Sequence, residues 1–303
     1  MAYTPAKIIS VQNISKAFGK TKALENASFD VDQGEIFGFL GPNGAGKTTT
    51  IRMLLDLLRP DSGNISLFGK NISSHSIEIR QQCGYLPGEF TAYNNLTGIE
   101  FLNLIKNIRK PKTDDCQSLF TQFGLTEHDL NRRIKYLSHG TIQKIGIIQA
   151  FFHSPSLLIL DEPTTGLDPL MQEVFYQLVF EEKKKGNTVF LSSHNLAEVE
   201  KLCSRVAIIR KGRIVSIKPM DELKERLGRT INIKLKEPIE NLEIKGTKVI
   251  QENGLEVSLR QEGELSGVLE QLAKLPVADI SISKPELEEV FIEFYKDDND
   301  EKI

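Results

Sequence analysis

The chain has 303 residues, of which 40% are hydrophobic and 26% charged, with a formal net charge of -3. This is ordinary globular composition with room for two domains, and the near balance of charge predicts no basic surface for nucleic acid. The three cysteines, Cys83, Cys116 and Cys203, share no metal-ligand spacing, which fits a reducing cytoplasm better than a disulfide framework. No stretch approaches the ~18 apolar residues of a membrane helix, and the N-terminus lacks the apolar run of a secretion signal.

The first part of the chain predicts short strands, then a glycine-rich loop and a helix. Three strands are expected, at 8–14, 27–31 and 35–40. The last of them is a compact apolar run that continues directly into Gly41. Residues 48–58 have the apolar periodicity of a helix, which Pro60 and Gly63 end.

The middle of the chain predicts a helical insert, over about 88–154. Two helices are expected inside it, at 96–108 and at 114–123, the second closed by Gly124. A buried strand, a helix, a strand and a hairpin are expected after it, at 157–160, 170–185, 188–191 and 205–217. This order predicts an α/β fold with a parallel sheet.

A shift in composition near Gly228 predicts a second, smaller α+β domain. Its expected strands lie at 231–235, 256–259 and 278–282, and its helices at 265–275 and 285–295. We therefore expect one domain over 1–227 and an accessory domain over 228–303.

The loop that follows the third strand has the G-x-x-x-x-G-K-[ST] pattern of a phosphate-binding loop. It consists of Gly41, Pro42, Asn43, Gly44, Ala45, Gly46, Lys47 and Thr48, and Thr49 follows it in the helix. Glycines let backbone N–H groups converge on phosphate oxygens, and the start of the following helix favours the same anion. Lys47 is expected to reach the β- and γ-phosphates and the Thr48 hydroxyl to bind Mg²⁺. The loop thus predicts a site for Mg-ATP.

Two acidic residues follow the buried strand at 157–160. Asp161 at the end of the strand is expected beside Mg²⁺, and Glu162 is placed to polarise an attacking water. The pair alone is a weak signal, but together with the phosphate loop it predicts ATP hydrolysis.

Further motifs carry a resemblance to a known family. Residues 137–144 have the sequence LSHGTIQK, similar to the LSGGQ signature of ATP-binding cassette (ABC) ATPases. The segments at 166–169 and 192–194 match the D-loop and the switch histidine of that family, in the same order. Over about 8–217 the chain resembles the nucleotide-binding subunit of an ABC transporter, so the expected fold is a P-loop NTPase of ABC type with a helical subdomain.

The resemblance implies a role for several more residues. Phe18 matches the aromatic residue that stacks on adenine, a role favoured over that of a core residue. Ser138 and Gly140 are implied to bind the γ-phosphate of ATP held by another subunit, and Asp168 to lie at the seam between subunits. His194 is implied to bond the γ-phosphate. Two chains, as a homodimer or pseudo-dimer, would therefore enclose two ATP molecules.

Two positions depart from the family pattern. His139 replaces a glycine in the signature, and Gly88 stands where the family has a glutamine near Mg²⁺ and the attacking water. Either Glu89 or a water molecule would take over the missing contact, and we take Glu89 as the candidate metal ligand.

Two segments bear on partners. In the family, the region at 90–96 docks a helix of the membrane subunit; Phe90 and Tyr93 would either serve that groove or pack under the helical insert. Residues 287–291, LEEVF, resemble the extra domain of ATPases from drug and antibiotic exporters.

The expected function is an ATPase that drives export through a separate membrane permease, with the chain bound peripherally to the inner face of the cell membrane. A soluble ABC ATPase that acts on nucleic acid or the ribosome is the alternative. The insert lacks the sustained heptads of DNA-repair members, and the chain carries one set of motifs rather than the two of translation factors. A nucleotide switch without turnover is a third class, against which Glu162 argues.

Overall fold

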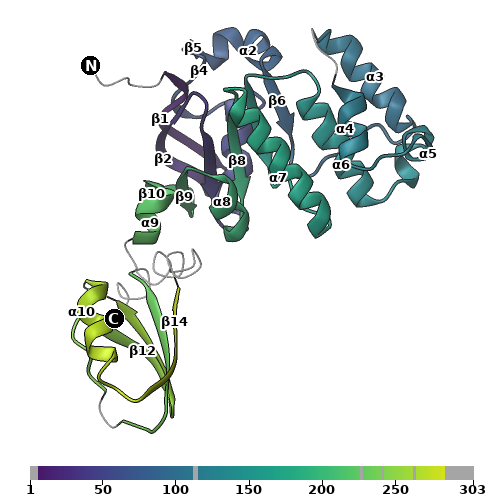
Figure 1. Ribbon diagram of the computed structural model, residues 1–303. Helices are drawn as coiled ribbons and strands as arrows, with labels where there is room; N and C mark the ends of the chain where they lie inside the picture. Colours follow the sequence, from purple (N-terminus) through teal and green to yellow (C-terminus); the bar gives the residue numbers. More distant parts are fainter. Residues whose placement is uncertain (1–5, 112–114, 226–227, 240–241, 262–263, 284–303) are drawn as a thin grey trace. The chain divides into compact units, whose positions relative to one another are not determined.

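The computed structural model describes residues 6–111, 115–225, 228–239, 242–261 and 264–283 (Figure 1). The chain divides into two compact units, Met1–Ile217 and Lys218–Ile303. The domain boundary expected from composition, between 227 and 228, stays a prediction.

A six-stranded sheet forms the centre of the first unit, in the order β10-β9-β3-β8-β7-β6. Its strands are β3 (Ile36–Leu40), β6 (Cys83–Leu86), β7 (Leu157–Asp161), β8 (Thr188–Ser193), β9 (Arg205–Arg210) and β10 (Arg213–Pro219). Strand β3 is parallel to β8 and β9, and β7 is parallel to β6 and β8. Every residue of β3, β7 and β8 is buried, as expected for parallel strands covered on both faces.

A second, four-stranded sheet in the order β2-β1-β4-β5 packs against the first. It consists of β1 (Lys7–Phe18), β2 (Thr21–Asp32), β4 (Ser62–Leu67) and β5 (Lys70–Asn71). Phe29 of β2 joins the sheets, because its ring centroid lies 5.4 Å from that of Phe39 on β3 and 5.9 Å from that of Phe190 on β8. Helix α1 (Lys47–Leu54) adds Ile51 and Leu54 to this core.

Helix α1 is shorter than its sequence predicts. The apolar periodicity continues to residue 58, but Asp56 adopts a left-handed backbone with a φ of 52°, which a continuing helix does not allow. Helix α2 (Ile72–Gln81), which Asn71 caps, was not predicted.

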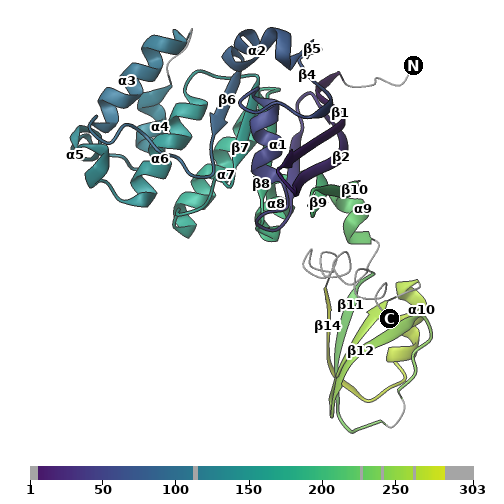
Figure 2. The same cartoon turned by 180° about the vertical axis from the view of Figure 1, so that it is seen from behind.

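Where the helical insert is expected, a group of helices lies at one end of the first unit (Figures 1 and 2). It contains α3 (Gly98–Arg109), α4 (Cys116–Gln122), α5 (Glu127–Asn131), a 3-10 turn (Ile134–Tyr136) and α6 (His139–Phe151). Helix α3 begins two residues later than expected because Thr97 and Glu100 form a capping box. Helices α7 (Pro169–Lys184) and α8 (Leu196–Leu202) complete the unit.

The second unit contains the small α+β fold that the sequence predicts. Its elements are α9 (Met220–Glu225), β11 (Thr230–Leu235), β12 (Thr247–Asn253), β13 (Glu256–Gln261), α10 (Leu265–Leu272) and β14 (Val277–Ser283), with strand order β12-β13-β11-β14. Ile231, Leu259 and Val268 belong to its apolar core. Strand β12 was not predicted, since its residues are mostly exposed and show no apolar alternation. The helix expected at 285–295 and its LEEVF segment lie outside the described residues.

Candidate functional site

The predicted phosphate loop lies between β3 and α1, and two of its glycines are required by close packing. A Cβ atom on Gly41 would lie 2.4 Å from the carbonyl oxygen of Ile209. One on Gly46 would lie 2.7 Å from that of Ala23, and Gly46 has a φ of 112°. Side chains at these positions would displace the loop, so the glycines fix its path as well as keep it open.

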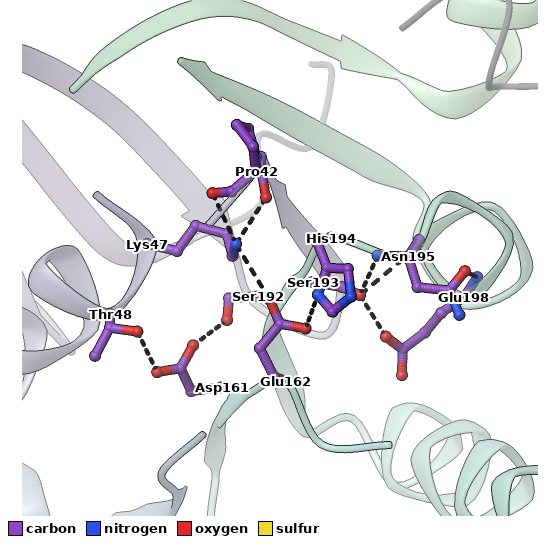
Figure 3. A network of polar contacts seen from close by, with 11 residues as sticks. Pro42, Lys47, Thr48, Asp161, Glu162, Ser192, Ser193, His194, Asn195 and Glu198 are labelled. Carbon is purple, nitrogen blue, oxygen red and sulfur yellow. Dashed lines mark hydrogen bonds and ion pairs between the residues drawn. The ribbon is translucent and has the colours of Figure 1, made fainter. Parts of the chain in front are cut away.

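Lys47 folds back over this loop (Figure 3). Its Nζ donates to the carbonyl oxygens of Gly41 at 2.7 Å and Pro42 at 3.2 Å. The same Nζ lies 3.1 Å from Oε1 of Glu162, and the lysine is only 5% exposed. The predicted phosphate-binding lysine and the predicted base are therefore neighbours.

Asp161 lies between two hydroxyl groups at the end of β7. The Thr48 hydroxyl donates to its Oδ2 at 2.8 Å, and the Ser192 hydroxyl donates to its Oδ1 (Figure 3). Hydroxyl and carboxylate oxygens are hard ligands that suit Mg²⁺, which commonly uses one or two carboxylates together with phosphates and water. No cluster of three or more His, Cys, Asp and Glu side chains that could hold a metal occurs in the described part of the chain. The donor set thus fits a metal that arrives with a phosphate ligand.

Glu162 is held between Lys47 and His194. Its Oε2 lies 2.6 Å from Nδ1 of His194, and its backbone N–H donates to the carbonyl oxygen of Ser192 at 3.0 Å. The backbone φ of Glu162 is 49°, a left-handed conformation that is uncommon outside glycine. The turn after β7 thereby directs this carboxylate across the ends of β3 and β8.

Four site residues implied by the resemblance lie outside this network. Ser138 caps α6 by accepting from the N–H of Thr141 at 3.1 Å, and Asp168 caps α7 by accepting from that of Met171 at 3.0 Å. Phe18, at the end of β1, is 52% exposed. Within the described residues, neither these three nor Gly140 makes a hydrogen bond or ion pair with the side chains around Lys47.

The segment after β6 contains Gly88, which stands where the resemblance implies a glutamine. A Cβ atom on Gly88 would lie 3.4 Å from Cγ and Oδ2 of Asp161, so a longer side chain there would reach the predicted metal site. Glu89 is exposed and makes no hydrogen bond or ion pair with any residue that the structure describes. Its role as a ligand stays a prediction.

The two aromatic residues that follow differ in their surroundings. The Phe90 ring packs edge-on against that of Phe101 at 5.8 Å, and a Cβ atom on Gly146 would lie 2.7 Å from it. Phe90 is therefore part of the packing under the helical insert. Tyr93 is 66% exposed and free for a partner.

Sequence reasoning missed the contacts of several residues around the site. Ser192 and Ser193 were noted only as neighbours of His194, yet each donates to a buried carboxylate, on Asp161 and Glu198 respectively. Gln143 donates to the carbonyl oxygen of Pro163 at 2.8 Å. The His139 ring packs closely against Gly166. A Cβ atom on Gly166 would lie 2.3 Å from Nδ1 of His139. The two serines at the end of the buried strand β8 were the one available signal.

Comparisons with known proteins agree with this geometry. A family model described as "ABC transporter" matches residues 24–165. A bacitracin transport ATP-binding protein of Bacillus licheniformis is 36% identical over 296 residues, which cover 94% of this chain and 96% of that protein. The chain belongs to the ABC transporter family. It is an ATP-binding protein of that family and an ATPase.

Other matches extend the comparison for this ABC ATPase. A linearmycin resistance ATP-binding protein of Bacillus subtilis is 37% identical over 228 residues, covering 73% of this chain and 72% of that protein. A solved structure of an ATP-binding subunit of an ABC transporter has a TM-score of 0.66 at 32% identity, covering 72% of this chain and 92% of that one. A second family model, "ATP-binding protein DrrA1-3-like, C-terminal domain", matches residues 219–295. In the part of the chain that the structure describes, no helix combines the length and the hydropathy of a membrane span.

Proposed function

We propose that this ABC ATPase powers the export of an antibiotic-like compound through a separate membrane permease. The observation that carries the proposal is the network in which Lys47, Glu162 and His194 meet at the ends of three neighbouring parallel strands. The names of the two relatives, for bacitracin transport and linearmycin resistance, support the class of compound.

In the proposed reaction Lys47 binds the β- and γ-phosphates of ATP, and Glu162 accepts a proton from the attacking water. Thr48 and Asp161 hold Mg²⁺, which when bound neutralises charge on the phosphates. Lys47 Nζ lies 3.1 Å from Oε1 of Glu162, so phosphate oxygens that bind the ammonium group would compete with that carboxylate.

A second copy of the chain is proposed to complete the site. Ser138 is exposed and Gly140 half-buried at the start of α6, and among the described residues they do not bond to the phosphate loop of their own chain. A helix N-terminus favours phosphate, so the signature of one chain faces the ATP of another. Asp168, at the start of α7, lies at the seam, and Phe18 stacks on adenine from its exposed position.

The test uses Glu162→Gln, which keeps the size of the side chain and removes the base. We expect ATP turnover to fall at least about a hundredfold, while the chain still binds ATP and forms dimers that size-exclusion chromatography detects. Glu173→Gln, an exposed carboxylate paired with Lys201, is the matched control and should leave turnover unchanged. Unchanged turnover in Glu162→Gln would remove Glu162 from the mechanism.

The permease is proposed to dock beside Tyr93, which would place the chain on the inner face of the cell membrane. Tagged protein isolated from membranes should carry a polypeptide with several membrane helices, and Tyr93→Asp should lose it while basal ATP turnover stays unchanged. Retention of that polypeptide by the variant would exclude Tyr93 from the docking surface.

A further inference from the structure

Helix α8 carries a buried carboxylate that the reaction described above does not use. Glu198 is 1% exposed, and its Oε2 accepts a hydrogen bond from the Ser193 hydroxyl at 2.6 Å. Its Oε1 is also buried and accepts no hydrogen bond from a residue that the structure describes. Burial of a carboxylate costs stability, so a purely structural role is a poor explanation for this residue.

The Glu198 carboxylate is connected to the turn that carries His194. The Ser193 hydroxyl, which donates to Glu198, also accepts from the backbone N–H of Asn195 at 2.9 Å (Figure 3). The Asn195 side chain accepts in turn from the backbone N–H of Glu198 at 3.3 Å. These hydrogen bonds link residues 193, 195 and 198 in a ring. The residues before and after His194 are therefore both held in place.

The Glu198 carboxylate also lies close enough to the end of β7 for the charge of Glu162 to affect its pKa. The pKa of Glu198 is raised to about 7, mainly by burial and to a smaller extent by the negative charge of Glu162, while Ser193, Thr164 and His194 act in the opposite direction. Thr164 follows Glu162 in the turn after β7, so Glu198 faces both halves of the Glu162–His194 contact. Tyr176 and Cys203 also face Glu198, and the pKa values of both are raised in part by its charge.

We propose that Glu198 is a positioning residue for hydrolysis, which holds the turn of residues 193–195 so that His194 stays against Glu162. The inference rests on the proposed function, in which His194 belongs to the network with Lys47 and Glu162. Glu198 does not reach the 2.6 Å contact between His194 and Glu162 itself, and acts on it through the Ser193 hydroxyl and the Asn195 backbone.

The first part of the test compares Glu198→Ala, Glu198→Gln and Ser193→Ala. Glu198→Ala removes the acceptor and should lower kcat about ten- to hundredfold, with KM for ATP changed less than about threefold, because loss of geometry affects the reaction more than binding. Glu198→Gln keeps an oxygen that accepts from Ser193 and should restore most of kcat. Ser193→Ala breaks the same link from its other end and should behave like Glu198→Ala. Glu173→Ala is the exposed control and should leave kcat unchanged.

The second part is a double-mutant cycle with His194→Ala, followed by single-turnover hydrolysis with excess protein. If Glu198 acts through His194, adding Glu198→Ala to His194→Ala should change the rate less than about twofold, since the two positions act as one unit. A full, additive loss in that background would overturn the inference, as would wild-type kcat in Ser193→Ala. If His194→Ala itself hydrolyses ATP at the wild-type rate, the proposed role of His194 fails first and the inference falls with it. A slow His194→Ala with additive effects overturns only the role of Glu198.

Discussion

The two units of this ABC ATPase bury different kinds of side chain. In the first unit, buried residues include Lys47, Asp161, Ser192, Ser193 and Glu198. In the described part of the second unit, the buried side chains are apolar. Burial of a polar group costs free energy unless the group is paired. The buried polar groups of the first unit therefore indicate a functional site, whereas the buried groups of the second unit serve packing. Substitutions in the two should therefore change different measurements.

The largest difference is expected at Lys47. Lys47→Ala removes the ammonium group that binds the loop carbonyls and Glu162, and with it the proposed phosphate contact. ATP turnover should fall about a hundred- to thousandfold, as when a preorganised charge is removed from an active site. Lys234→Ala on β11, an exposed lysine of the second unit near Glu256, should change turnover less than twofold. Equal losses in both variants would break the contrast between the units.

The reverse effect is expected at Leu259, a fully buried residue of β13. Leu259→Ala should lower the free energy of unfolding of the second unit by about 2–5 kcal/mol, because it leaves a cavity in a small apolar core. Denaturant unfolding followed by circular dichroism measures the loss. Basal ATP turnover of the same variant should stay within about twofold of wild type. A proportional loss of turnover would show that the second unit takes part in the chemistry.

A pH-dependent effect follows from Glu198. Its pKa is raised from 4.5 to about 7, so the folded chain holds a proton that the unfolded chain releases between these values. The free energy of unfolding therefore falls as pH rises through this window, by up to about 3 kcal/mol, and is constant above it. Glu198→Gln cannot ionise and should lack this loss, so its stability relative to wild type should increase from pH 5 to pH 8. Parallel stability curves for the two proteins would contradict the raised pKa.

The smallest effect is expected at Gly88, where an added side chain would approach Asp161. Gly88→Gln should lower the Mg²⁺ concentration for half-maximal turnover by less than about tenfold, because it adds one neutral oxygen ligand to the site. Glu89→Ala tests whether the neighbouring carboxylate already supplies that contact. If Glu89→Ala leaves both the rate and the Mg²⁺ dependence unchanged, Glu89 is not a ligand.

The sequence predicted those parts of the site in which neighbours along the chain decide the chemistry. The strand–loop–helix order at 36–54 and the Asp161–Glu162 pair are local patterns, so the structure places them where they were expected. Phe90 had two possible roles because only its contact with Phe101, distant in sequence, decides between them. Glu198 was missed for the same reason. The sequence contains its partner Ser193 nearby, but it does not show that the surrounding elements bury Glu198. Strand β12 was missed because its exposed residues show no alternation.

The left-handed backbone of Glu162 limits which residues can ever replace it. At a φ of 49°, a β-branched side chain such as valine adds backbone strain of about 1–3 kcal/mol to the loss of the carboxylate. Asparagine, aspartate and glycine tolerate this conformation better. Substitutions that arise at this position without selection for activity should therefore favour those three residues. A copy of this chain that had lost activity would keep the backbone conformation of the turn longer than the Glu162 carboxylate.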